Sequence, residues 1–152
     1  MFVLLRQLDR LRRGIAPAPS GVRGSLAVRH VDAGSCNGCE HELGATLNPY
    51  YDIQQYGLNV VASPRHADVL LVTGAITTCM AAPLLAAYGA MPEPRLVAAL
   101  GDCALGCGVL ALRAELAAPL EELLPVSIRI PGCPPSPEAI AEHLIAALGA
   151  QT

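Results

Sequence analysis

Five cysteines stand in three short segments rich in glycine and proline, and the thiols of four of them could together hold a metal centre. The segments read S-C-N-G-C-E-H-E, G-D-C-A-L-G-C-G and P-G-C-P-P-S-P, and the four residues are Cys36, Cys39, Cys103 and Cys133. Thiolates take part in disulfide exchange, bind zinc and hold iron–sulfur clusters. The Cys-x-x-Cys pair therefore leaves three interpretations open: a redox disulfide, half of a zinc site, or one side of a cluster.

Each of these segments follows a predicted β-strand. Apolar runs predict strands at 25–31, 58–62, 68–73, 96–100 and 126–130. Helices are expected at about 40–47, 50–56, 78–90, 109–116 and 138–148, with Pro83 near the first turn of its helix. Continuous apolar strands that alternate with helices indicate an α/β fold, a parallel sheet covered by helices on both faces. Because loops that follow parallel strands emerge at one edge of the sheet, the four thiols can converge there.

The spacing favours an iron–sulfur cluster over its rivals. A redox pair would use Cys36 and Cys39 and leave Cys103 and Cys133 unexplained. A structural zinc site usually draws on two close pairs, whereas one pair and two distant single cysteines occur here. Glycines would let the backbone approach a cluster closely, and prolines would stiffen the loops. Zinc and unliganded thiols remain alternatives.

Two further cysteines, Cys79 and Cys107, exceed what one cubane needs. Each is expected at the start of a helix that follows a strand. We interpret both as small thiols that pack near the site.

Composition indicates one domain that is covered by partner proteins. The 152 residues are 53% hydrophobic, with a mean hydropathy of +0.43 and a net charge of −3. No apolar run approaches the ~20 residues that span a bilayer, so this apolar surface is expected to meet partner subunits. All ten basic residues are arginine, and four of them fall in the first thirteen positions. The acidic remainder argues against nucleic-acid binding.

The first residues predict an amphipathic arm. Leu4, Leu8, Leu11 and Ile15 recur at helical spacing within residues 1–24, which end in a Pro/Gly/Ser-rich linker, while residues 25–150 form the α/β domain. The arm could contact a membrane surface or a partner, or be a solvated terminus. It does not read as a secretory signal, so the protein is expected in the cytoplasm, where metal ligands or free thiols are more common than disulfides.

The ordered motifs resemble a known family. S-P-R-H-A-D-V-L-L-V-T-G (63–74), M-P-E-P-R (91–95), G-D-C-A (101–104) and P-G-C-P-P-S-P (131–137) are similar to the small iron–sulfur subunit shared by respiratory complex I and the NiFe hydrogenases. C-N-G-C-E-H-E looks like the membrane-bound, energy-converting hydrogenases and formate hydrogenlyase, because the complex I subunit typically has two adjacent cysteines here. The sequence departs from the family at A-I-T-T-C-M, where relatives usually have a proline and a basic residue.

The resemblance implies a flavodoxin-like fold and one 4Fe–4S cluster bound by Cys36, Cys39, Cys103 and Cys133. It also implies a NiFe-type large subunit, ferredoxin-like iron–sulfur subunits and membrane subunits as partners, on the inner face of the cell membrane. The chain would relay electrons and would not be catalytic alone. A quinone-linked, complex I-like role is the nearest alternative, and a zinc-stabilised assembly module is a rival of another class.

Three residues beyond the cysteines draw attention in the light of this resemblance. Glu42 matches an acidic family position and could serve a proton path or tune the cluster, or it could be a solvated helix residue. His41 is a cluster neighbour or a surface residue. Arg65 could place positive charge near the cluster or pair with Asp68.

Overall fold

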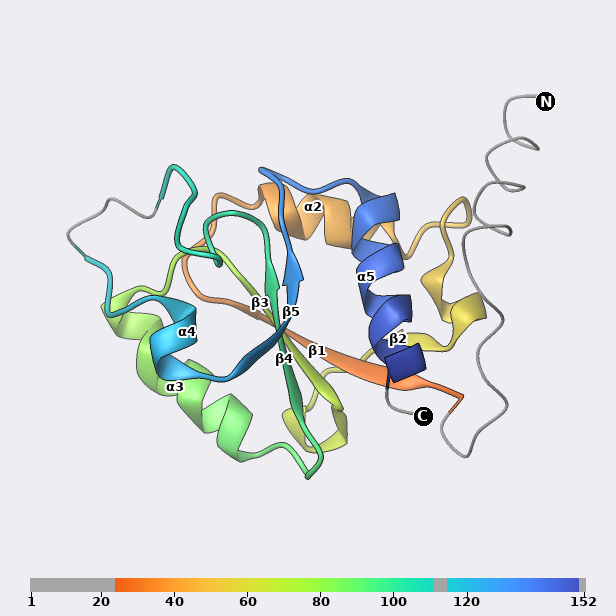
Figure 1. Ribbon diagram of the computed structural model, residues 1–152, viewed down its shortest axis with the longest axis horizontal. Helices are drawn as coiled ribbons and strands as arrows, with labels where there is room; N and C mark the ends of the chain where they lie inside the picture. Colours follow the sequence, from red (N-terminus) through yellow and green to blue (C-terminus); the bar gives the residue numbers. More distant parts are fainter. Residues whose placement is uncertain (1–23, 111–114, 151–152) are drawn as a thin grey trace.

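A parallel five-stranded sheet forms the centre of the computed structural model, which describes residues 24–110 and 115–150 (Figure 1). The strands are β1 (Leu26–Asp32), β2 (Leu58–Val60), β3 (Val69–Thr73), β4 (Leu96–Leu100) and β5 (Val126–Ile130), in the order β2-β1-β3-β4-β5. Every residue of β3 is buried, as expected of a central strand with helices on both sides. The predicted α/β fold is confirmed.

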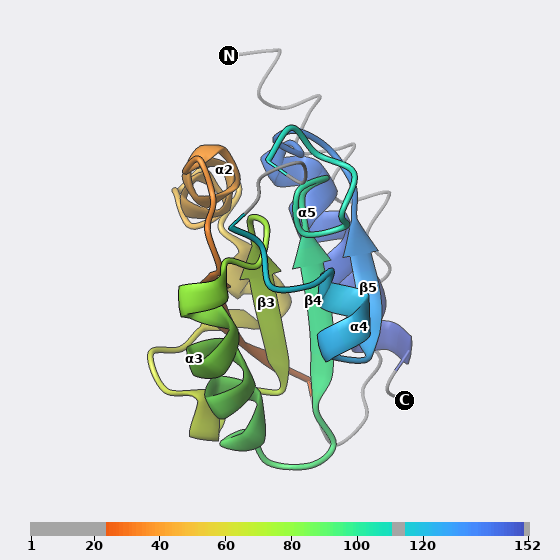
Figure 2. The same ribbon diagram turned by 90° about the vertical axis from the view of Figure 1, so that its left-hand side faces the viewer.

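Helices cover the sheet on two sides and close two separate apolar cores. On one face α2 (Gly38–Ala45) and α5 (Pro137–Ala150) bury Leu43, Ile140 and Leu144 against the strands. On the other face α3 (Thr78–Gly89) and the short α4 (Leu120–Leu123) bury Leu84 and Leu120. Figure 2 shows α3 and α4 on the side of the sheet opposite α5. Among the helices of the described ranges, none combines the length and apolar character of a membrane span.

Several predicted elements differ from the observed ones. The helix expected from residue 40 begins at Gly38, and the helix expected at 50–56 is reduced to a 3₁₀ helix, η1 (Ile53–Tyr56). Residues 109–110 lie in a turn, so the helix expected at 109–116 is wrong there; residues 111–114 lie outside the described part. Pro83 is the sixth residue of α3 and not in its first turn. The arm expected at 1–24 lies outside the described residues up to position 23.

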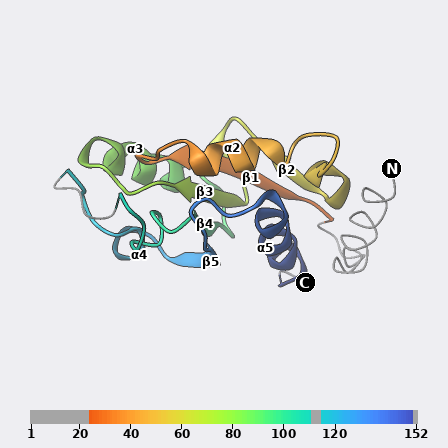
Figure 3. The ribbon, with the colours of Figure 1, turned by 90° about the horizontal axis from the view of Figure 1, so that it is seen from above.

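The carboxyl ends of the strands lie along one edge of the sheet, and the cysteine loops begin there. Cys36, Cys103 and Cys133 lie in loops that follow β1, β4 and β5, and α2 and α5 begin at the same edge. We call it the carboxyl edge; Figure 3 views it from above. The sheet therefore brings three loops together that are far apart in the sequence.

Candidate functional site

The four predicted ligand cysteines are electrostatic neighbours at the carboxyl edge. Burial raises the pKa of the Cys39 thiol to about 12. Negative charge nearby acts in the same direction and comes from Glu40, Cys103, Cys36 and Cys133. Partial loss of hydration, followed by the charges of Cys103, Asp102 and Cys36, likewise raises the pKa of the exposed Cys133 thiol. The structure thus brings together the thiols from all three loops.

The raised pKa values of Cys39 and Cys133 indicate what a metal centre would have to do in order to bind here. Negative charge on the neighbouring cysteines opposes ionisation of Cys39 and Cys133, so these two thiols keep their protons at neutral pH when no cationic partner is bound. A metal centre bound there would have to displace those protons and supply positive charge. Within residues 24–110 and 115–150, no group of three or more His, Cys, Asp or Glu side chains is placed to coordinate a single metal ion.

Glycines lie directly against the sulfur atoms. A Cβ at Gly101 would come within 2.5 Å of the Cys39 sulfur, and one at Gly108 within 2.4 Å of the Cys103 sulfur. Gly101 also has a φ of +87°, which favours glycine. The space beside these two sulfurs therefore depends on the absence of side chains, as the sequence predicted for loops that approach a metal centre.

An aspartate fixes the loop that carries the Cys-x-x-Cys pair. Asp32 ends β1, and its Oδ1 accepts hydrogen bonds from the N–H groups of Gly34 at 2.9 Å and Ser35 at 2.8 Å. Burial raises the pKa of Asp32, but these hydrogen bonds outweigh it and leave the pKa below its usual value. Asn37, the residue before α2, has a left-handed backbone conformation with a φ of 67°, and the helix begins directly after it. Cys36 is thereby left exposed before the helix, and Cys39 lies half-buried in its first turn.

A second aspartate fixes the loop after β4. The carbonyl of Asp102 accepts hydrogen bonds from the N–H groups of Cys107 and Gly108, both at 2.9 Å, which closes the loop around Cys103. The Sγ of Cys107 lies 3.5 Å from the same carbonyl oxygen. Cys107 is therefore held in the loop and is not at the start of a helix. Cys79 does lie in the first turn of α3, and both of these thiols are exposed, which corrects their interpretation as packed thiols.

Two glutamates, Glu40 and Glu42, follow Cys39, and they lie in different surroundings. Glu42 is half-buried, and its charge is among those that raise the pKa of the Tyr51 hydroxyl, after burial and Glu138. That hydroxyl donates a 3.0 Å hydrogen bond to Glu138 at the start of α5. His41 is exposed. Glu42 thus lies within electrostatic range of the Tyr51 hydroxyl.

Glu40 is the acid that sequence reasoning missed. Its Oε1 accepts a hydrogen bond from the Thr73 hydroxyl, and the His30 ring lies 3.6 Å away. A sequence signal existed in the E-H-E tripeptide, but it does not say which glutamate faces the sheet. Arg65 is exposed in η2 (Pro64–His66), before β3 and therefore at the opposite edge of the sheet, so the suggestion that it lies near the cluster is wrong.

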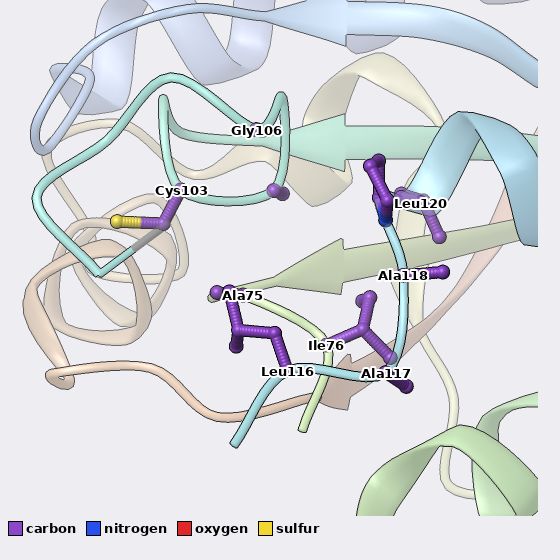
Figure 4. Close-up of a pocket in the computed structure, with 10 residues that line it drawn as sticks. Ala75, Ile76, Cys103, Gly106, Leu116, Ala117, Ala118 and Leu120 are labelled. Atoms are coloured by element: carbon purple, nitrogen blue, oxygen red, sulfur yellow. The ribbon is translucent and has the colours of Figure 1, made fainter. Parts of the chain in front are cut away.

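An apolar pocket of about 300 Å³ adjoins the Cys103 loop (Figure 4). Ala75 and Ile76 after β3 and Leu116 before α4 line it, and the Cys103 sulfur points away from these side chains. Apart from that thiol, no polar side chain lines the pocket. It offers apolar contacts, and the residues that line it include no acid or base and no nucleophile other than the Cys103 thiol.

Comparisons with known sequences give the same family along most of the chain. A profile of the family described as NADH ubiquinone oxidoreductase, 20 Kd subunit, matches residues 36–147. The chain is 42% identical over 139 residues to a probable membrane-bound hydrogenase subunit of Pyrococcus furiosus, covering 91% of this chain and 83% of that protein. It is 41% identical over 128 residues to formate hydrogenlyase subunit 7 of Escherichia coli. That match covers 84% of this chain but only 50% of the relative, which is the longer protein.

Solved structures share the fold. One is from the membrane-bound sulfane sulfur reductase, an archaeal respiratory membrane complex, with a TM-score of 0.70 and 27% identity over 84% of this chain and 72% of that chain. Another, from an NAD⁺-reducing NiFe hydrogenase, has a TM-score of 0.65 at 18% identity over 83% and 92% of the two chains, a likeness of fold alone. The resemblance carried by the sequence motifs is thus confirmed, and the chain belongs to the family of the 20 kDa NADH ubiquinone oxidoreductase subunit.

Proposed function

We propose that this protein is the electron-transfer subunit of a membrane-associated, formate hydrogenlyase-like hydrogenase complex. It binds one 4Fe–4S cluster through Cys36, Cys39, Cys103 and Cys133 and relays electrons between ferredoxin-type subunits and a NiFe site on a large subunit. The observation that carries the proposal is the meeting of four thiols from three loops at the carboxyl edge. The identity of 42% to a membrane-bound hydrogenase subunit supports the choice of complex.

The donor set and the space around it fit such a cluster. All four donors are thiols, the ligands that cubane clusters take, and Gly101 and Gly108 leave room beside two of the sulfurs. A bound cluster supplies one-electron chemistry. Its iron would also provide the positive charge that keeps four neighbouring thiolates ionised.

The chain's own residues bind and orient. Asp32 and Asp102 hold the backbone of two cysteine loops, while half-burial of Cys39 and Cys103 keeps water from part of the site. Limited water strengthens the effect of nearby charges on a redox centre. The protein acts as an oxidoreductase subunit together with its partners, and the identity to a membrane-bound hydrogenase subunit supports this role.

The carboxyl edge is also the surface that a partner would cover. Cys36 and Cys133 are exposed there, and Val109, in the loop after β4, is 76% exposed. An exposed cluster edge beside apolar side chains suits docking of the large subunit and a ferredoxin-like subunit. Attachment to the inner face of the cell membrane would follow through membrane subunits of the complex.

Glu42 belongs to this proposal as a group on a proton path. Its partly exposed carboxylate, with Tyr51 and Glu138 nearby, could pass protons between solvent and the region behind Cys39. Glu42→Gln in the assembled complex should then slow hydrogen turnover while the iron content stays unchanged. Unchanged turnover would leave Glu42 as a helix residue without a proton role.

Anaerobic reconstitution tests the ligand set. The full chain should bind about four irons and show broad visible absorbance, which Cys→Ser at position 36, 39, 103 or 133 should remove. Cys79→Ser and Cys107→Ser are the matched controls and should keep both signals. Stoichiometric zinc without visible absorbance would favour the zinc-stabilised module instead, and full iron content in Cys133→Ser would contradict the ligand assignment.

Purification of the native complex tests the choice of partner. A copurifying large subunit that contains nickel is expected. A nickel-free complex that reduces quinone would support the complex I-like alternative.

A further inference from the structure

A small polar network lies between the sheet and the first turn of α2, directly behind Cys39. His30 on β1 and Thr73 at the end of β3 lie on neighbouring paired strands, and Glu40 reaches them from the helix. The Thr73 hydroxyl donates its proton to Oε1 of Glu40, and the Nε2 of His30 lies 2.9 Å from the same hydroxyl oxygen. Because a threonine has one hydroxyl proton, the ring must donate from Nε2.

The carboxyl group of Glu40 is more buried than is usual for an acidic side chain. Thr73 is fully buried, and the side chains of His30 and Glu40 are 23% and 19% exposed. The Glu40 Oε2 atom is itself shielded from water, and no partner for it occurs among the described residues. A carboxylate in such surroundings is costly unless its charge is compensated.

The neighbouring histidine does not supply that compensation. Burial lowers the pKa of His30 and outweighs the opposing effects of Glu40 and Asp32. The ring is therefore neutral at neutral pH, and it serves as a hydrogen-bond donor and not as a counter-ion. The carboxyl group of Glu40 is thus held by the Thr73 hydroxyl at Oε1, has no hydrogen-bond partner at Oε2 among the described residues, and lies one residue from a predicted cluster ligand.

We propose that Glu40 lowers the reduction potential of the cluster, and that Thr73 and His30 are positioning residues that hold its carboxylate behind Cys39. The inference rests on the proposed function, since it assumes that Cys39 is a ligand. A fixed negative charge in poorly screened surroundings opposes the arrival of an electron, so it stabilises the oxidised state. A low potential suits a relay that exchanges electrons with a hydrogen-producing centre.

Glu40 could instead serve as a mechanical anchor. Acidic residues in the first turn favour helix formation, and the contact with Thr73 ties α2 to the sheet. An anchor would influence folding and iron content but not the potential of clusters that do assemble. The midpoint potential therefore separates the two roles.

The experiment is a redox titration of the reconstituted full chain, followed by electron paramagnetic resonance, with iron content measured in parallel. Glu40→Gln keeps an oxygen for Thr73 and removes the charge. It should raise the reduced-to-oxidised ratio at a fixed ambient potential about tenfold, a shift of about 59 mV for one electron. Glu42→Gln, on the same helix but near Tyr51, should shift the ratio clearly less.

Substitutions at Thr73 keep the charge and change its position. Thr73→Val should raise the potential in the same direction, because it releases the carboxylate toward solvent, and Thr73→Ser should restore it. These two Thr73 variants also test whether Glu40 lowers the reduction potential if the Glu40→Gln variant fails to bind iron. An unchanged potential in Glu40→Gln, or in Thr73→Val when the first variant is empty, overturns the role of Glu40 and leaves the proposed function intact. Failure of the wild-type chain to bind iron would instead contradict the proposed function.

Discussion

Asp102 and Gly132 form a reciprocal pair across two neighbouring loops. The Asp102 Oδ1 accepts a hydrogen bond from the Gly132 N–H at 2.7 Å, and the Asp102 N–H donates to the Gly132 carbonyl at 2.9 Å. Since Cys103 and Cys133 directly follow these two residues, the pair sets the distance between two predicted ligands.

Asp102→Ala should therefore weaken both the fold and the site. Loss of the acceptor leaves a partly buried N–H of Gly132 unpaired, and we expect the free energy of unfolding to fall by about 1–3 kcal/mol in urea titrations. Iron content after reconstitution should fall as well. Asp102→Asn keeps an acceptor oxygen and should recover most of both; equal losses in the two variants would contradict this assignment.

Gly108→Ala should close the space beside Cys103. The added methyl group would meet the Cys103 sulfur at 2.4 Å and its backbone nitrogen at 2.6 Å, so the loop must shift. We expect loss of most bound iron, measured by metal analysis. Gly44→Ala is the matched control, because no atom lies within 4 Å of its new Cβ in α2. That variant should gain about 0.5–1 kcal/mol of stability and bind iron normally.

Asp32 should make stability depend on acidic pH. Its pKa in the folded protein lies below the usual 3.8, so the charged carboxylate stabilises the fold above that value. This contribution is lost as the pH falls through the folded-state pKa. Wild type should be more stable than Asp32→Asn at neutral pH, and the difference should shrink toward about pH 3 in urea unfolding. A difference that is independent of pH would rule out the charge as its source.

Alkylation should divide the six cysteines into two groups. Cys79 and Cys107 are exposed, and we place them outside the ligand set, so iodoacetamide should label them in both the metal-free and the reconstituted chain. The four proposed ligands should become protected on reconstitution, as read by peptide mass spectrometry. Protection of Cys107 in place of any one of them would require a different ligand set.

The sequence predicts the two central strands, β3 and β4, well because they are apolar over almost their whole length. The runs V-L-L-V-T and L-V-A-A-L are buried except for a half-buried Leu96, and short apolar runs bounded by turn residues are typical of parallel strands that are covered on both faces. The meeting of the cysteine loops follows from strand direction alone, so that part of the candidate site was also predictable.

Contacts between distant residues explain what the sequence does not predict. The pattern of residues 109–116 favours a helix, yet residues 109–110 lie in a turn and Leu116 pairs with Thr77 in an isolated bridge, so tertiary contacts override local propensity in the described residues of this segment. Glu40 escapes detection for a similar reason. Its burial depends on Thr73 and His30, which come together only once β1 and β3 pair.

The order of the three cysteine loops has a consequence for biogenesis. The proposed four-thiol site needs Cys36 from the loop after β1 and Cys133 from the loop after β5, and α5 follows Cys133 directly. A nascent chain still missing β5 therefore presents at most three of the four thiols in place. Delivery of the proposed cluster must accordingly follow synthesis of the chain through Cys133, and a product truncated before that residue would carry no complete site to compete for iron.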